Sequence, residues 1–294
     1  MAGHTPLLSD PAFETLAAGG KRLRPLLVFC SAPRGALEQD ALVSAACSVE
    51  LVHMATLVHD DIIDHAAMRR GRPTVAQAQG PDAALRVGDF LFARAFSELT
   101  RAGQPRAVQA LAESSLDLSR GELLQQAAEH DLDLTEAAYT ERCWGKTASL
   151  FAVSCRLGAM VGGADRDVED RVAAFGEHVG LAFQIFDDIL DLTGDPAKTG
   201  KRRGADLRDG TVTLPLILAM QDDPAMRRRV AQVGSDDASI DELCDELATH
   251  AGTREARERA LGYVAAARES VSDVDTVATK ALLAIADGVV DRYA

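Results

Sequence analysis

Apolar residues recur at helical spacing along most of the chain, in long segments separated by short breaks that contain Gly or Pro. No alternation with a period of two, typical of a half-buried strand, is found. A short amphipathic helix is expected from Asp10 to Ala18, with Pro11 at its first position. Longer helices are predicted over residues 40–64, 82–103, 105–129, 135–162 and 166–193, followed by others from about Thr213 to Tyr293. The pattern therefore predicts an all-α protein.

Two of the predicted helices carry three aspartates each within an apolar run. The first motif is Asp-Asp-Ile-Ile-Asp (60–64) and the second is Asp-Asp-Ile-Leu-Asp (187–191). On a helix, residues at i and i+4 share a face and lie roughly 6 Å apart along the axis. Like charges placed in this way destabilise a helix, and burying them unpaired costs several kcal/mol. The negative charge of each motif is therefore expected to be neutralised by a partner.

Basic residues lie on the segments next to these motifs. Lys21 and Arg24 follow Gly19-Gly20, and Met68-Arg69-Arg70-Gly71-Arg72 follows the first motif. The ordinary interpretation of the first group is a basic turn exposed to solvent. The ordinary interpretation of the second group is that cations are favourable near the C-terminus of any helix. Two further polar residues, His53 and Gln184, precede the motifs on nearly the same helical faces.

Composition narrows the class of protein. The chain has 294 residues, of which 47% are hydrophobic and 26% charged, as in a globular protein. The net charge of −14 gives no basic footprint for nucleic acid. The five cysteines show no CxxC spacing, so we expect buried thiols in a reducing, cytoplasmic compartment. No signal peptide is recognised, and no run of 18 apolar residues indicates a membrane span.

Paired carboxylates alone also fit a glycosidase or a di-iron site. Di-iron bundles need Glu-x-x-His pairs, which neither motif contains, and glycosidases do not need the basic loops. Carboxylates that leave room for water and phosphate oxygens suit Mg²⁺. With cationic loops and apolar helices behind them, they predict Mg²⁺-dependent chemistry on a lipid diphosphate.

From Gly19 to near its C-terminus, the chain resembles the trans-polyprenyl diphosphate synthases. The resemblance rests on the order and spacing of specific motifs. These are Gly-Gly-Lys-Arg-Leu-Arg-Pro (19–25), the first motif with Arg-Arg-Gly-Arg-Pro-Thr (69–74), Gly-Lys-Thr-Ala (145–148) and Phe-Gln-Ile-Phe-Asp-Asp-Ile-Leu-Asp (183–191).

The resemblance implies an all-α bundle of antiparallel helices around a deep central cavity, as one domain over residues 1–294, in a homodimer. It implies that isopentenyl diphosphate is joined to an allylic diphosphate and that diphosphate is released. The two aspartate motifs are expected to face each other across about three Mg²⁺ ions and a diphosphate.

The same resemblance assigns the site residues. The metal ligands are Asp60, Asp64 and Asp187, supported by Asp61, Asp188 and Asp191. The allylic diphosphate would be held by Arg69, Lys146, Thr147, Gln184 and Lys201. Isopentenyl diphosphate would be held by Lys21, Arg24, His53 and Arg70.

Two departures from the family pattern stand out. Thr211 occupies the place where the family usually has a second lysine, so one diphosphate contact is expected either to be missing or to be supplied by Arg202 or Arg203. Only 18 residues precede Gly19, so the first helix is expected to be shortened.

In this family, the residues just before the first motif form the floor of the tail cavity. Here they are Val52, Ala55 and Thr56, all small or medium in size. We therefore expect an all-trans product longer than farnesyl, from geranylgeranyl to long-chain, which partitions into membranes. Leu116, Leu118 and Trp144 are candidates for a deeper floor.

Two rival functions share part of this pattern. A terpene cyclase has the fold and the first motif, but its second motif usually mixes Asn, Ser or Thr with Glu. A non-catalytic partner subunit typically loses aspartates, and all six are present here.

Overall fold

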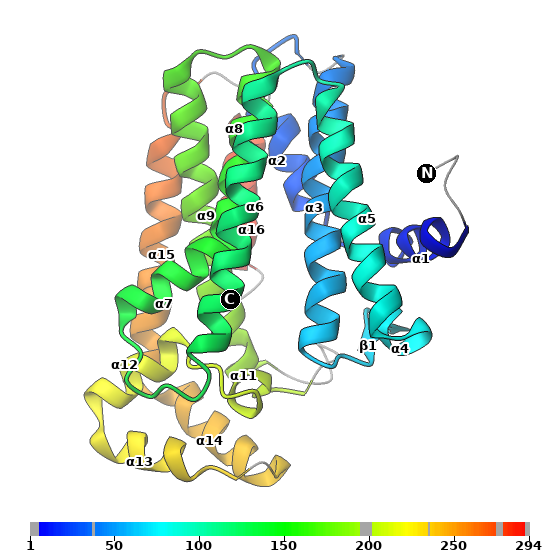
Figure 1. The fold of residues 1–294 in the computed structure, drawn as a ribbon. Coiled ribbons are helices and arrows are strands. Elements are labelled where there is room, and N and C mark those ends of the chain that lie inside the picture. The colour runs from blue at the N-terminus through cyan, green and yellow to red at the C-terminus, as the bar shows by residue number, and fades with distance from the viewer. Residues whose placement is uncertain (1–5, 37–38, 195–201, 235, 275–278, 292–294) are drawn as a thin grey trace. The chain divides into compact units, whose positions relative to one another are not determined.

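The computed structural model describes residues 6–36, 39–194, 202–234, 236–274 and 279–291. Almost all of its regular structure is helical (Figure 1). The helices are α1 (Pro6–Ala17), α2 (Leu23–Ser31), α3 (Asp40–Ile63), α4 (Val75–Gln79), α5 (Pro81–Thr100), α6 (Pro105–Ala127), α7 (Glu136–Cys143), the π-helix η1 (Trp144–Ala148), α8 (Ser149–Gly162), α9 (Arg166–Thr193), α11 (Ala205–Arg208), α12 (Leu214–Asp222), α13 (Pro224–Gln232), α14 (Asp237–Thr249), α15 (Ala251–Ser270) and α16 (Thr279–Asp291). A two-residue hairpin of β1 (Met68–Arg69) and β2 (Arg72–Pro73) pairs antiparallel. The all-α fold class is thereby confirmed.

The described residues fall into two compact units. The first unit holds the residues up to Ser115 together with Val153–Asp170, and the second holds Leu116–Ala152, Arg171–Val274 and the residues from Thr279. The boundary between the units falls inside α6, α8 and α9. The expected single domain over residues 1–294 stays a prediction.

Helix α3 is the central element of the first unit. It packs along α5 and also contacts α2 and α4 (Figure 1). Leu42, Val49 and Val52 are fully buried on α3, which accounts for its apolar sequence. By length and composition, α3 is the one described helix apolar enough to cross a membrane. Its packing and the aspartates at its end are those of a core helix.

Helices α12 and α15 form a packed pair in the second unit, with α7, α13, α14 and α16 against one or the other. Seven consecutive residues of α12, from Leu214 to Met220, are buried. Phe175 and Phe186 of α9 are also fully buried, and they lie about three turns apart on one face of that helix. This packing fixes the helix from which Gln184 and the second motif project.

Several local expectations need correction. Helix α1 begins at Pro6, so Pro11 lies inside it and not at its first position. The helix expected over residues 135–162 is divided by the π-helix η1. Cys47 is exposed, whereas the other cysteines are buried as expected.

Candidate active site

The first aspartate motif spans the end of α3. Asp60 is partly buried, Asp61 is buried and Asp64 is exposed. Asp64 follows the last helical residue, and its backbone N–H still donates to the Asp60 carbonyl at 2.8 Å. The helical relation between Asp60 and Asp64 is therefore kept although α3 ends between them.

The hairpin after α3 returns a cation to this motif. Arg69 Nε donates to Asp61 Oδ1 at 2.7 Å. Burial raises the pKa of the Asp61 carboxyl, and Arg69 opposes that rise. Thr74 anchors the hairpin, because its hydroxyl donates to the Ala66 carbonyl at 2.7 Å and caps α4 by accepting from Gln77 N. Asp61 is thus engaged by protein, in keeping with a supporting role.

Four arginines act on His53. Burial lowers the pKa of His53 to about 2, helped by the charges of Arg24, Arg70, Arg69 and Arg22. His53 is therefore a neutral imidazole within a cationic group. Burial also lowers the pKa of Arg24 to about 10, against the opposing charge of Glu50, so Arg24 stays protonated at neutral pH. The structure brings together Arg24, His53 and Arg70, three of the residues expected to hold isopentenyl diphosphate.

The Gly19-Gly20 break gives Arg70 its place. Arg70 donates to the Gly19 carbonyl, and a Cβ at Gly20 would lie 2.9 Å from Arg70 Nη1. Gly20 also has φ +135°, a conformation that side chains disfavour. Lys21 is exposed and lies outside α2, which begins at Leu23. Lys21 and Arg24 therefore do not lie on the same helix.

The second motif presents its three aspartates in different ways. Asp187 is exposed, whereas Asp188 is buried and accepts from Tyr139 Oη at 2.6 Å and from Gln184 Nε2 at 2.8 Å. Thr147 Oγ1 donates to Gln184 Oε1 at 2.7 Å. Burial raises the pKa of Asp188 to about 7, against the hydrogen bonds from Tyr139 and Gln184. Two residues expected at the allylic diphosphate, Thr147 and Gln184, are thus bonded to each other, and Gln184 links them to Asp188.

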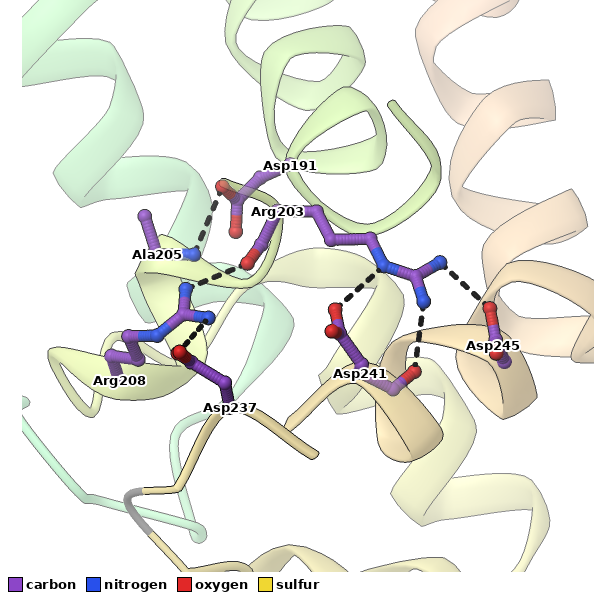
Figure 2. A network of polar contacts seen from close by, with 7 residues as sticks. All are labelled: Asp191, Arg203, Ala205, Arg208, Asp237, Asp241 and Asp245. Carbon is purple, nitrogen blue, oxygen red and sulfur yellow. Dashed lines mark hydrogen bonds and ion pairs between the residues drawn. The ribbon is translucent and has the colours of Figure 1, made fainter. Parts of the chain in front are cut away.

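Asp191 caps a short helix. Its Oδ1 accepts from the backbone N–H of Ala205 (Figure 2) and its Oδ2 from that of Asp206, each at 3.1 Å, and its carbonyl accepts from Gly204 N. Burial raises the pKa of Asp191 despite these bonds. Asp191 therefore connects the end of α9 to the start of α11 by hydrogen bonds. The sequence did not suggest this structural role.

Arg202 and Arg203 form ion pairs with aspartates of α14. Arg203 Nε lies 2.9 Å from Asp241 Oδ1 and its Nη1 lies 2.7 Å from Asp245 Oδ1 (Figure 2). Arg202 pairs with Asp237. Both guanidinium groups bind α14, so the expectation that they replace the family lysine at Thr211 is not supported by their contacts.

The π-helix η1 carries Lys146 and Thr147. Lys146 Nζ lies 2.6 Å from Glu122 Oε2 of α6. The two backbones touch here, because a Cβ on Gly121 would lie 2.3 Å from Lys146 N. π-Helical turns recur at functional sites. Lys201, the last residue expected at the allylic diphosphate, lies outside the described residues.

The aspartates fit a hydrated metal better than an enclosed one. No three His, Cys, Asp or Glu side chains form a metal-binding group within the described part of the chain. Asp61, Asp188 and Asp191 are held by protein donors, whereas Asp64 and Asp187 are exposed and Asp60 partly so. Mg²⁺ usually keeps several waters and takes one or two carboxylates, so the donor set suits it. The ligand assignment stays a prediction.

The residues expected to form the tail cavity differ in exposure. Val52 and Ala55 are fully buried, and Thr56 is partly buried. Leu118 is buried, but Leu116 is 72% exposed. Leu116 is therefore no longer a candidate for the deeper floor of the tail cavity.

The sequence did not single out several residues that hold this site. They act through contacts distant in sequence: Glu50 with Arg22, Glu122 with Lys146, Tyr139 with Asp188, and Asp206 through its burial near the second motif. A signal existed for Tyr139 alone, which lies seven residues before Lys146 and two turns along the same predicted helix.

The fold and both aspartate motifs define an all-α protein of the isoprenoid synthase type. The family model "Polyprenyl synthetase" matches residues 5–249. "Heptaprenyl diphosphate synthase component 2" of Geobacillus stearothermophilus is 42% identical over 227 residues, covering 77% of this chain and 71% of that protein. The chain belongs to the polyprenyl synthetase family and is a prenyltransferase.

Solved structures agree with this assignment. The heptaprenyl diphosphate synthase of Staphylococcus aureus superposes with a TM-score of 0.93 at 30% identity, covering 100% of this chain and 94% of that one. A polyprenyl synthase from Caulobacter crescentus CB15, complexed with calcium and isoprenyl diphosphate, gives 0.91 at 34% identity, covering 100% and 92%.

Proposed function

We propose that this enzyme condenses isopentenyl diphosphate head to tail with an allylic prenyl diphosphate, forming an all-trans polyprenyl diphosphate and releasing diphosphate. The observation that carries the proposal is the group of arginines around a neutral His53. Several cations around an uncharged hydrogen-bonding ring suit a diphosphate. Arg69 also belongs to this group and contacts the first aspartate motif, so the cations adjoin carboxylates that suit a hard metal ion.

Mg²⁺ is the metal we propose, held by Asp60, Asp64 and Asp187, with about three ions when diphosphate is bound. The donor chemistry of these carboxylates supports it, and the related Caulobacter crescentus protein was crystallised with calcium, another hard divalent ion. When bound, the metal supplies positive charge that stabilises the leaving diphosphate.

The residues of the chain have the remaining tasks. Arg69, Lys146, Thr147 and Gln184 would bind the allylic diphosphate and stabilise its growing charge. Arg24, His53 and Arg70 would orient isopentenyl diphosphate, whose double bond attacks the allylic carbon. Apolar residues of α3 would exclude water from the allylic cation. The proton lost at the end passes to the released diphosphate, so no side-chain base is needed.

The product we propose is longer than farnesyl. Heptaprenyl synthases are among the relatives of the chain, and Val52, Ala55 and Thr56 put no bulky side chain before the first motif. Such a product partitions into membranes after release, because each added isoprene unit adds apolar surface.

A homodimer is the assembly we propose. Leu116 and Leu123 lie seven residues apart on one face of α6 and are 72% and 65% exposed. Exposed leucines at this spacing suit a helix partner. The related Geobacillus protein is named component 2. The alternative assembly is therefore one that contains a second, different kind of subunit. Light scattering of the purified chain tests this, because a monomeric mass would contradict the homodimer.

The cytoplasm is the compartment we propose. All five cysteines are free, and four of them are buried. Free thiols are typical of reducing compartments. Fractionation of the native host with an antibody tests the location.

One incubation separates the proposed reaction from its rivals. The purified chain receives labelled isopentenyl diphosphate, an allylic primer and Mg²⁺, and a matched sample receives excess chelator. We expect label in a prenyl diphosphate only when metal, primer and isopentenyl diphosphate are all present. Hydrocarbon formed from the primer alone would indicate a terpene cyclase. Product that appears only after another synthase is added would indicate a non-catalytic subunit.

A further inference from the structure

Arg142 of α7 is a buried charge that the proposed reaction does not use. The residue is 4% exposed, and its Nη2 donates to the carbonyl of Val212 at 2.8 Å. Its Nη1 is buried and has no hydrogen-bond partner among the described residues. Burying a guanidinium costs several kcal/mol unless opposite charge lies nearby. A role for this charge must therefore be sought in its surroundings.

The carboxylates of the second motif provide that opposite charge. Arg142 favours the ionised forms of Asp188 and Asp206, two carboxyl groups whose pKa values burial raises. The guanidinium carbon also lies 5.2 Å from the ring centroid of Tyr139, whose hydroxyl donates to Asp188. Arg142 thus lies over the ring of the buried tyrosine whose hydroxyl binds Asp188.

Asp188 in turn organises two residues assigned to the allylic diphosphate. Its Oδ1 accepts from the Gln184 amide nitrogen, and the Gln184 oxygen accepts from the Thr147 hydroxyl. The Gln184 side chain thus presents its NH₂ to Asp188 and its oxygen to Thr147. Asp188 therefore holds the orientation of both side chains through these two hydrogen bonds.

The other contact of Arg142 lies at the start of α12. Val212, whose carbonyl it binds, immediately precedes Thr213, the N-cap of that helix. Thr211, one residue earlier, donates its N–H to the Asp206 carbonyl at 2.8 Å. The same guanidinium therefore ties the chain at residues 211–213 to the helix that carries Tyr139.

We propose that Arg142 is a positioning residue: it packs over the ring of Tyr139, whose hydroxyl binds Asp188, and it fixes the segment 211–213, and thereby keeps Gln184 and Thr147 oriented for the allylic diphosphate. This inference rests on the proposed function, since Gln184 and Thr147 are assigned through it. A positioning role predicts that loss of Arg142 weakens diphosphate binding, beyond any effect on stability.

The test compares Arg142→Met and Arg142→Lys with the control Arg171→Met. Arg171 likewise donates to a backbone carbonyl, that of Ser270 at 3.1 Å, but none of its recorded contacts reaches the second motif. Three quantities are measured: KM and kcat for the allylic substrate, the Kd of inorganic diphosphate with Mg²⁺ by calorimetry, and the midpoint of thermal unfolding. The calorimetric Kd needs no turnover, so it separates failure of this proposal from failure of the proposed function.

We expect Arg142→Met to raise both KM and Kd about tenfold or more, with a smaller change in kcat. Arg142→Lys should recover most of the affinity, because lysine keeps the positive charge. It lacks only the planar guanidinium group. Arg171→Met should leave KM and Kd unchanged even if its unfolding midpoint falls. Unchanged KM and Kd in Arg142→Met, or a lysine variant no better than the methionine one, would overturn the proposal.

Tyr139→Phe decides the question if Arg142→Met does not fold. It removes only the hydroxyl that donates to Asp188 and opens almost no cavity. We expect the Kd of diphosphate to rise about threefold or more, as for loss of one hydrogen bond to a charged group. An unchanged Kd would overturn the proposal. A different outcome is that the variants raise Kd as expected but the wild-type protein shows no condensation activity. This outcome would reject the proposed function and would still support the positioning role of Arg142.

Discussion

Arg69 Nε lies 2.7 Å from Asp61 Oδ1, and this ion pair joins strand β1 to the last turn of α3. The Asp61 side chain is only 6% exposed, whereas Arg69 is 31% exposed. The arginine therefore satisfies a buried carboxylate and still reaches solvent, where a diphosphate can meet it.

Arg69→Met should lower the free energy of unfolding by about 3 kcal/mol, because it leaves the buried Asp61 carboxylate without its charged partner. Urea denaturation measures the change. Arg101→Met is the control, since Arg101 is 70% exposed and lies 3.7 Å from Glu98. The control should change stability by less than about 0.5 kcal/mol. Equal effects of the two substitutions would contradict the structural role of this pair.

His53 should make the protein sensitive to acid. Its folded pKa of about 2 lies below the ordinary value of 6.5, so the unfolded chain binds the proton more readily. Stability from this residue is therefore lost as the pH falls below about 6.5. At pH 5.5 the loss should be roughly 1 kcal/mol, and His53→Gln should remove it. Chemical denaturation between pH 7.5 and 5.5 measures this slope. A His53→Gln slope equal to the wild-type slope would refute the explanation.

Lys146 and Glu122 should give opposite effects on substrate binding. Lys146 Nζ lies 2.6 Å from Glu122 Oε2, so the carboxylate competes with diphosphate for the ammonium group. Lys146→Met should raise the allylic KM roughly 30-fold, by losing a charge-assisted contact worth about 2 kcal/mol. Glu122→Gln should leave KM unchanged or lower it. Steady-state kinetics test both, and a higher KM in Glu122→Gln would show that the pair positions Lys146 and does not compete.

Gly121→Ala should disrupt the contact between α6 and η1. The new Cβ would lie 2.3 Å from Lys146 N, so a backbone must move. We expect a loss of about 2–3 kcal/mol, together with weaker diphosphate binding, because Lys146 moves with its backbone. Gly262→Ala is the matched control, since nothing lies within 4 Å of its Cβ. It should stabilise α15 by about 0.5–1 kcal/mol. Thermal unfolding measures both, and equal outcomes would contradict the packing described.

Ala55→Phe should shorten the product. Ala55 is fully buried on α3, just before the first motif, so a phenyl ring there would reduce the space behind it. Mass spectrometry of the products tests this. Ala260→Phe, at a fully buried position on α15, controls for overpacking, which typically costs about 1–3 kcal/mol. The same product spectrum from Ala55→Phe and the wild type would reject Ala55 as part of the floor.

Sequence patterns predicted the long helices well, because burial of one face imposes a periodicity that survives in a single chain. The bounds expected for α9 are those observed, and those for α3 differ at one end by one residue. The π-helix η1 was missed, since a segment of 5 residues is too short to show a period of its own. The hairpin at Met68–Pro73 was missed because two-residue strands are too short to show alternation.

The parts of the site that place charged residues in apolar helices could be predicted from the sequence. The parts that depend on contacts between distant segments could not. Asp60 and Asp187 stand out because carboxylates interrupt apolar helices. Arg142 looks like any helical arginine, and only folding brings it to Val212, seventy residues later. Asp191 was expected to support metal, but its capping of α11 joins residues distant in sequence, which no local pattern encodes.

The most direct measurement of the central claim is the mass of the product formed from farnesyl diphosphate, isopentenyl diphosphate and Mg²⁺, together with the diphosphate released. We predict a series of prenyl diphosphates, each longer than farnesyl, with one diphosphate released for every isopentenyl unit incorporated. Farnesyl diphosphate recovered unchanged, or converted to a hydrocarbon without incorporation of isopentenyl units, would contradict the claim.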